Sequence, residues 1–233
     1  MNYIEGVILM QKKAVAFTGH RPESLPFGRD MHSGKYDDFE LILWKEIGRC
    51  IDEGYDTFYC GGARGADIVC GEIIIAEKMT KSPHIQLVCA IPYKEQADRW
   101  GWMWRTRYFD LLRAADKIKQ LCDGYQRGCF HIRNRYMVDN CDLLIAIYNG
   151  EDKGGTAYTV NYARQLGKEI LIIDPKDGKV EGVIDCRNLL PKKLRTVTTD
   201  VLNGIALNPD DGKIYITGKN WPILYEIKLT EKK

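Results

Sequence analysis

Short apolar runs alternate with amphipathic stretches along the first three quarters of the chain. The apolar runs predict buried β-strands at residues 14–18, 57–60, 85–91, 117–121, 142–148 and 169–173. Apolar positions at helical spacing predict helices between them, at residues 34–53, 66–81, 94–115, 132–140 and 156–166. Such alternation is typical of an α/β fold, here a Rossmann-like parallel sheet with helices on both faces. Ligands of these sheets bind beyond the carboxyl ends of the strands.

The pattern changes after Asp174. Strand-like stretches follow at residues 180–185, 201–207, 213–217 and 224–229, and Asn208-Pro-Asp-Asp-Gly212 is a hairpin turn signal. We predict two units: an α/β domain at 1–174 and a short antiparallel β-meander at 175–233. An isolated meander would leave its apolar positions in water, so we expect it to dock on the α/β domain, pair with another chain or stay partly disordered. These positions are Ile205, Leu207, Ile214, Ile216, Leu224 and Ile227.

Composition narrows the class of protein. Of the 233 residues, 45% are apolar and 28% are charged, which is typical of a globular chain. The net charge of +2 argues against nucleic acid or an anionic membrane as a partner. Eight cysteines without a two-residue spacing indicate buried, reduced thiols. Residues 1–13 lack the charge order of a secretory signal, and no run reaches the roughly 20 apolar residues of a membrane span, so we expect a cytoplasmic protein.

The first candidate motif follows the first predicted strand. Thr18, Gly19, His20 and Arg21 combine a flexible turn with a hydroxyl, an imidazole and a guanidinium suited to phosphate. The alternative is a polar turn with a surface arginine.

A second motif, Gly61-Gly62-Ala63-Arg64-Gly65-Ala66-Asp67, runs from a strand into a helix. Exposed amides at a helix N-terminus favour an anion, and glycines remove Cβ obstruction. Asp67 could equally cap the helix. Glu72 follows five residues later and could point away from the site.

The third motif, Gly154-Gly155-Thr156, repeats this arrangement before another helix. Two such turns in one sheet favour phosphate binding more than either alone. In the fourth, Arg133-Asn134-Arg135-Tyr136-Met137-Val138-Asp139, an arginine could reach the ligand and Asp139 could accept a ribose hydroxyl. The alternative is a solvated helix face.

The aromatic residues between 100 and 109 and the histidines are two further candidate residue sets. The aromatic run from Trp100 to Phe109 is typical of a hydrophobic core or a dimer interface, so the protein could form a homo-oligomer. The alternative is that these residues stack on nucleic-acid bases. His32, His84 and His131 are scattered along the chain, so the sequence predicts no metal site.

The four motifs together resemble the YpsA-like family of the SLOG superfamily, which also contains the Smf/DprA and LOG proteins. The resemblance covers residues 13–173. It implies a Rossmannoid fold and a nucleotide-derived ligand. LOG enzymes are phosphoribohydrolases that release a base from a nucleoside monophosphate, and Smf/DprA proteins bind single-stranded DNA. LOG enzymes carry a glutamate three residues after the threonine of the glycine motif, where this chain has Thr159. Losing that carboxylate favours ligand sensing over hydrolysis.

The tail carries a second resemblance. Segments 178–185, 200–206 and 215–222 resemble the C-terminal end of glutamine cyclotransferases, β-propeller enzymes that make N-terminal pyroglutamate. Asn203, Lys219 and Trp221 lie in these segments, and Ile-Ile-Asp-Pro at 172–175 is a candidate seam. The similarity covers a small fraction of a propeller, so we expect no cyclotransferase activity.

Our leading hypothesis is a sensor or regulator that binds a small-molecule nucleotide ligand such as NAD, ADP-ribose or a nucleoside monophosphate. The main alternative is an N-glycosidic hydrolase using Asp67, Glu72 or Asp139. Single-stranded DNA binding and a residual cyclotransferase activity of the tail are further alternatives.

Overall fold

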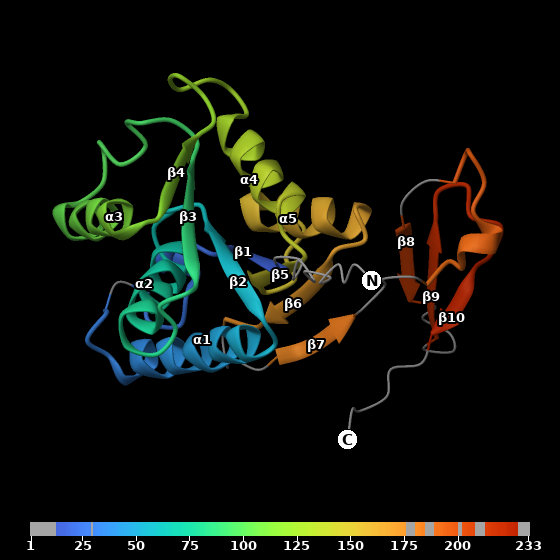
Figure 1. Cartoon of the computed structure of the whole chain (residues 1–233), viewed down its shortest axis with the longest axis horizontal. Helices are drawn as coiled ribbons and strands as arrows, with labels where there is room; N and C mark the ends of the chain where they lie inside the picture. The colour runs from blue at the N-terminus through green and yellow to red at the C-terminus, as the bar shows by residue number, and fades with distance from the viewer. Residues whose placement is uncertain are drawn as a thin grey trace, which may run out of the picture.

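The structure is a computed structural model that describes residues 13–28, 30–175, 180–184, 189–199, 202–207 and 213–227. The strands at 180–184 and 202–207 are described through their backbone alone. A seven-stranded sheet carries helices on both faces, and a three-stranded antiparallel sheet follows near the C-terminus (Figure 1). The predicted α/β fold with a C-terminal β-meander is confirmed.

The large sheet has the strand order β4-β3-β2-β1-β5-β6-β7. Its first six strands along the chain are parallel to one another, as expected from the alternation with helices. These strands are β1 (Lys13–Gly19), β2 (Tyr55–Cys60), β3 (Gln86–Ile91), β4 (Lys117–Gln120), β5 (Leu143–Ile147) and β6 (Glu169–Ile173). The chain builds outward from β1 to β4 on one side, then returns to place β5 on the other side of β1. The order therefore reverses between β1 and β5.

The seventh strand departs from the sequence analysis. β7 (Val180–Ile184), which the sequence placed with the C-terminal meander, pairs antiparallel with β6 and extends the large sheet. Six residues separate β6 from β7 in the sequence, whereas a parallel neighbour would require a crossover of a dozen or more residues. The sheet thus continues past the predicted boundary at residue 174.

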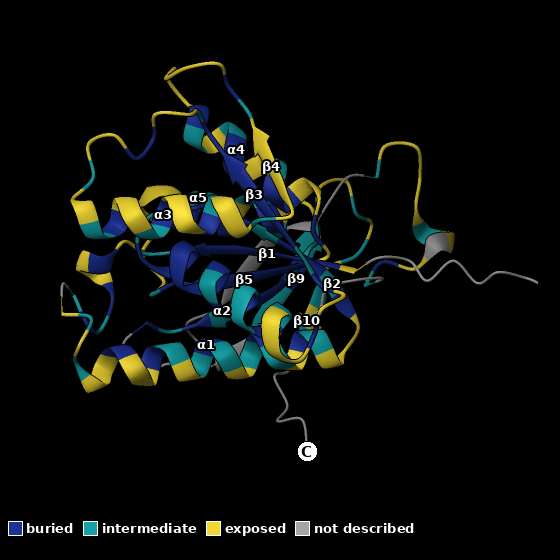
Figure 2. Ribbon diagram, turned by 60° about the vertical axis from the view of Figure 1, so that its left-hand side comes forward, coloured by how far each residue is buried: buried dark blue, intermediate teal, exposed yellow. Residues whose placement is uncertain are grey.

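The helices divide between the two faces of the sheet. α1 (Gly34–Asp52), α2 (Ala66–Thr80) and α3 (Trp102–Ala114) share one apolar core, while α4 (Cys129–Asp139) and α5 (Gly154–Gln165) pack over the second. Figure 2 shows β1, β3 and β5 as a buried layer between helices whose outer surfaces are exposed. Both faces of the central strands are covered, which explains why their sequences are apolar runs rather than alternating patterns.

Helix α3 begins later than the sequence predicts. The helical pattern was expected from Lys94, but residues 94–99 form turns whose amides reach back three residues, as from Trp100 to the carbonyl of Ala97. Gly101 then adopts an extended backbone, with ψ of 151°, and the helix starts at Trp102. The aromatic run divides accordingly, because Trp104 and Tyr108 are buried while Trp102 is 81% exposed.

The C-terminal meander contains β8 (Leu202–Leu207), β9 (Ile214–Gly218) and β10 (Tyr225–Ile227), each antiparallel to its neighbour. Its backbone approaches the large domain where β8 comes near α5. Ile216 is buried and Leu224 is 61% exposed, whereas the side chains of Ile205 and Leu207 lie outside the described residues. Within the part of the chain that the structure describes, no helix has the length and apolar character needed to cross a membrane.

Gly19 fixes how closely β1 approaches α2. A Cβ atom added there would lie 2.5 Å from the Cβ of Ala66 and 3.0 Å from the Cβ of Ile147. Only a residue without a side chain allows the first turn of α2 to pack against the carboxyl end of β1. The sequence "Thr-Gly-His-Arg" therefore has a packing reason for its glycine in addition to any role in ligand binding.

We predict that Gly19→Ala destabilises the protein by about 1–3 kcal/mol, the usual cost of overpacking a core. The matched control is Gly48→Ala in α1, where an added Cβ meets nothing within 4 Å. That control should stabilise the helix by up to about 1 kcal/mol. Urea denaturation of both variants measures the difference, and equal stabilities would contradict the packing role of Gly19.

Candidate functional site

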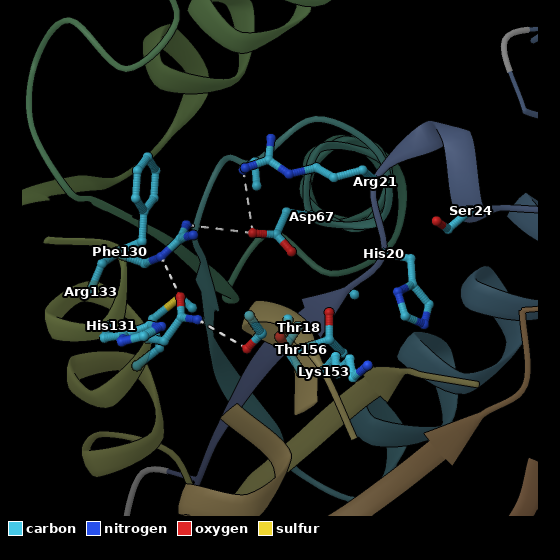
Figure 3. Close-up of a pocket in the computed structure, with 16 residues that line it drawn as sticks. Thr18, His20, Arg21, Ser24, Asp67, Phe130, His131, Arg133, Lys153 and Thr156 are labelled. Atoms are coloured by element: carbon cyan, nitrogen blue, oxygen red, sulfur yellow. Dashed lines mark hydrogen bonds and ion pairs between the residues drawn. The ribbon is translucent and has the colours of Figure 1, made fainter. Parts of the chain in front are cut away.

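A pocket of about 400 Å³ opens at the carboxyl ends of β1 and β5, where the strand order reverses. This is the position at which open α/β sheets form their ligand crevice, because the loops after these two strands leave toward opposite faces. Figure 3 shows side chains from β1, α2, α4 and α5 around it. The pocket is lined by Thr18, Gly19, His20, Arg21, Ser24, Ala63, Asp67, Phe130, His131, Arg133, Asn134, Met137, Lys153, Gly154, Gly155 and Thr156.

The turn after β1 supplies one side of the pocket. Thr18 is buried at the strand end, and His20 Nε2 lies 3.0 Å from Asn149 Oδ1 and 3.2 Å from the backbone nitrogen of Asn149. These contacts tie the β1 turn to the turn after β5. Although Arg21 is an exposed residue, desolvation of its guanidinium lowers its pKa, and the nearby charges of Arg133 and Arg64 act in the same direction while Asp67 opposes them.

The side chain of Arg133 makes two hydrogen bonds and one ion pair in the pocket wall. It is 5% exposed, and its Nη1 donates to the carbonyl oxygen of Gly61 while its Nε donates to Asn134 Oδ1 at 2.7 Å. The same Nη1 lies 3.6 Å from Asp67 Oδ2. A Cβ at Gly61 would lie 1.8 Å from Nη1, so the glycine is what lets the guanidinium reach the end of β2.

Asp67 is the carboxylate of the pocket and lies in the first turn of α2. It is 4% exposed, and its Oδ2 accepts a hydrogen bond from the amide of Ala63 at 3.3 Å. Burial raises the pKa of Asp67, while Arg133, the Ala63 amide and Arg21 counteract part of that rise. Figure 3 shows its other oxygen turned toward the side that Thr18 and His20 occupy.

The N-terminus of α5 forms the floor of the pocket. Gly154 has a φ of +93°, a conformation that favours glycine, and it starts the helix directly after Lys153. Gly155 and the buried Thr156 follow in the first turn. The first turns of α2 and α5 thus meet at one pocket, and each brings the positive end of a helix dipole. Among the lining residues, Arg21, Arg133 and Lys153 are cationic, whereas Asp67 is the one carboxylate.

Thr159 has a structural contact set. Its hydroxyl donates to the carbonyl oxygen of Gly155 at 2.7 Å and accepts a hydrogen bond from Asn134 Nδ2 at 2.7 Å. It is fully buried and is not among the residues that line the pocket. Asn134 therefore joins α4 to α5 through Thr159 on one side and holds Arg133 on the other.

Not every predicted residue reaches the pocket. Arg64 turns to Glu23, at 3.7 Å, and to the ring of Trp100. Glu72 binds Arg107, whose Nε donates to it at 2.7 Å. Asp139 sits at the far end of α4, where it accepts a hydrogen bond from Tyr162 at 2.7 Å. Among the three predicted catalytic candidates, the structure therefore brings only Asp67 to the pocket.

Gly62 and Gly65 of the second motif pack against residues next to the pocket and do not line it. Gly62, with a φ of +61°, packs against Tyr108, and Gly65, with a φ of +94°, lies under the backbone of His20. Neither lines the pocket, and a side chain at Gly65 would lie 2.6 Å from the carbonyl oxygen of His20.

Sequence reasoning missed several pocket residues. Lys153 precedes the predicted α5 glycines by one residue, so the motif boundary excluded it. Phe130 and His131 enter because α4 begins at Cys129, after Gly128 in the left-handed conformation, and not at Ile132 as predicted. That earlier start places the first turn of α4 at the pocket. The other lining residues that were missed are Ser24, Ala63 and Met137.

Comparison with known proteins supports the resemblance carried by the motifs. The YpsA family model, described as the YspA SLOG family, matches residues 15–177. A UPF0398 protein of Halalkalibacterium halodurans is 28% identical over 171 residues, covering 71% of this chain and 89% of the relative. A UPF0398 protein of Bacillus cereus is 23% identical over 158 residues, covering 67% and 85%.

A glutamine cyclotransferase family model matches residues 156–229. This match overlaps the first one at residues 156–177, which include the predicted seam at 172–175. Most of the match falls on the C-terminal strands. In the described part of these C-terminal strands, β7 belongs to the large sheet and the other three strands form the meander. The meander thus has fewer strands than one four-stranded propeller blade.

We predict that the raised pKa of Asp67 makes stability fall as pH rises. An unfolded aspartate loses its proton near pH ~3.9, whereas folded Asp67 holds it to higher pH. Between these two values the folded state binds more protons, so the free energy of unfolding decreases with increasing pH. Asp67→Asn removes this contribution and should flatten the dependence measured by urea denaturation from pH 4 upward.

Asp116 provides the opposite control. Burial acts to raise its pKa, but hydrogen bonds from Lys78 and the Leu87 amide outweigh it and lower the pKa. Stability from Asp116 is therefore lost as pH falls through that lowered value, and Asp116→Asn should remove a slope of the other sign. Identical pH dependences in wild type and Asp67→Asn would contradict the prediction for Asp67.

We also predict that the full-length protein forms no pyroglutamate from a peptide with N-terminal glutamine. The meander lacks the surrounding blades that assemble a propeller active site. Mass spectrometry of the incubated peptide measures the reaction against a protein-free control. A rate above that control would show that the tail is catalytically competent.

Proposed function

Because the chain belongs to the YpsA family of SLOG proteins, we propose that it binds a phosphate-bearing nucleotide or nucleotide-derived ligand and acts as a sensor or regulator. The ligand class includes NAD, ADP-ribose and nucleoside monophosphates. The phosphate lies between the first turns of α2 and α5, within reach of Arg21 and Lys153.

One observation carries this proposal: two helix N-termini meet a cationic pocket at the switch point of the sheet. Helix N-termini bind phosphate because unpaired amides and the helix dipole point at the anion. Arg21 and Lys153 add charge from two further directions, and glycines at 154 and 155 leave the α5 amides uncovered. The volume of about 400 Å³ falls within the range of small-molecule sites, roughly 300–1,000 Å³.

The hydrogen bonds of Thr159, Glu72 and Asp139 favour sensing over hydrolysis. Thr159 occupies the position of the LOG glutamate, and its hydroxyl is already bonded to Gly155 and Asn134. It carries no charge that could stabilise an oxocarbenium-like sugar. Glu72 and Asp139 are held in other contacts away from the pocket.

A second candidate function rests on Asp67. Its burial and raised pKa are features of catalytic carboxyl groups as well as of structural ones. An N-glycosidic hydrolase built on this site would use Asp67 to orient or deprotonate a water molecule. Release of free base from a nucleotide panel, abolished by Asp67→Asn, would favour that enzyme over a sensor.

The direct test is calorimetric titration of the full-length protein with NAD, ADP-ribose and nucleoside monophosphates. We expect binding of at least one ligand, and Arg21→Ala should weaken it by about 10- to 150-fold, since a charge-assisted contact contributes roughly 1.5–3 kcal/mol. The matched control is Arg135→Ala, which removes an exposed arginine of α4 that does not line the pocket.

Arg64→Ala resolves the role of the second motif. Because Arg64 contacts Glu23 and Trp100, we expect its loss to affect binding less than the loss of Arg21. Absence of binding by any of these ligands at millimolar concentration would reject the proposed function. An Arg135→Ala defect as large as that of Arg21→Ala would place the ligand elsewhere.

A further inference from the structure

The α4 side of the pocket ends in a stack of parallel aromatic rings. His131 lies face to face with Tyr158, with ring centroids 4.0 Å apart and planes 13° from parallel. Tyr158 is parallel to Tyr162, with centroids 6.5 Å apart and planes at 4°. The stack crosses from α4 to α5, since His131 belongs to the first helix and both tyrosines to the second.

Both ends of this stack are defined. At the outer end, the hydroxyl of Tyr162 donates to Asp139 at 2.7 Å, which fixes the last ring to the end of α4. At the inner end, His131 lines the pocket and is exposed. Tyr158 covers one face of the imidazole, so its second face is the surface that another planar ring can cover.

The neighbouring residue adds an apolar wall beside this ring. Phe130 lines the same pocket and is half-buried, and it forms a T-shaped pair with Tyr93, with ring centroids 6.0 Å apart. Figure 3 shows Phe130, Arg133 and His131 along one side of the pocket and His20 and Ser24 along the other. An aromatic surface therefore lies beside the cationic region that the two helix N-termini create.

We propose that His131 forms a nucleobase subsite, in which the base of the bound nucleotide continues the stack formed by Tyr158 and Tyr162. This inference rests on the proposed function, because it assigns the base while the helix N-termini hold the phosphate. Stacking on an aromatic face tolerates all bases, since each has a π-face. The subsite thus selects nucleotides over sugar phosphates without selecting strongly among bases.

The aromatic run of residues 100–109 does not compete for this role. Trp104 and Tyr108 are buried in the core, and none of the aromatic residues of that run lines the pocket. The sequence analysis offered base stacking as an alternative role for that run. The structure favours His131 for this role, although the sequence analysis treated it as an isolated histidine.

The test compares nucleoside 5′-monophosphates with ribose 5-phosphate, which carries the same sugar and phosphate without a base. Full-length protein is titrated calorimetrically with AMP, GMP, CMP, UMP and ribose 5-phosphate. We expect wild type to bind the nucleotides more tightly than ribose 5-phosphate. His131→Ala should weaken nucleotide binding by roughly five- to a hundredfold while leaving ribose 5-phosphate binding unchanged.

Two variants separate stacking from other effects of the substitution. His131→Phe keeps an aromatic ring and should retain most of the nucleotide affinity. His84→Ala removes an exposed histidine that precedes β3, at the opposite end of the strands, and should change nothing. Thermal unfolding of each variant verifies that it is folded.

The outcomes distinguish this inference from the function on which it rests. If none of these ligands binds, and NAD and ADP-ribose do not bind either, the proposed function fails together with the subsite. If ribose 5-phosphate binds as tightly as the nucleotides, or if His131→Ala weakens both classes equally, the phosphate site stands and the nucleobase subsite is wrong.

Discussion

The buried guanidinium of Arg133 connects the helices on the two faces of the sheet at the carboxyl ends of the strands. It extends from α4, on one face, to the end of β2 and to Asp67 at the start of α2, on the other face. Through Asn134 it is also coupled to Thr159 and so to the first turn of α5. The first turns of α2 and α5 are therefore joined by one connected set of contacts, an ion pair on the α2 side and hydrogen bonds on the α5 side.

The contacts of Arg133 contribute more to the orientation of its guanidinium than to the free energy of unfolding. An ion pair as buried as Arg133 and Asp67 gains Coulomb energy but loses the hydration of both charges, and these terms nearly cancel in many proteins. The hydrogen bonds to Gly61 and Asn134 add direction, because each requires a specific orientation of the guanidinium plane. These contacts fix the orientation of the guanidinium, and a charged group oriented in advance lowers the ordering cost of binding an anion.

The fold could be predicted from the sequence because its strands are covered on both faces. Such strands appear as continuous apolar runs, and six of them were found with their parallel arrangement. β7 could not be assigned in the same way, since its five residues have no pattern that predicts which strand they pair with. Thr18, Arg21, Arg133 and Thr156, which the motifs singled out, line the pocket, and their role in ligand binding stays a prediction.

Some residues of the predicted motifs lie outside the pocket, because a motif does not determine the direction of each side chain. Arg64 and Glu72 lie on segments that reach the pocket, yet local partners turn their side chains elsewhere. A motif locates a backbone segment, whereas the direction of a side chain depends on neighbours distant in sequence. His131 illustrates the converse, because its stacking partner Tyr158 is 27 positions away and belongs to another helix.

The antiparallel pairing of β7 with β6 bears on where the protein can be shortened. Cutting at residue 174 follows the composition change, but it would strip β6 of a hydrogen-bonded neighbour along residues 170–173. An uncovered strand of that kind is a template for association with other chains. The opposite edge is protected differently, since β4 is four residues long and carries Lys117 and Lys119 on an exposed surface. A truncated version that keeps residues 180–184 would retain β7 as the hydrogen-bonded neighbour of β6.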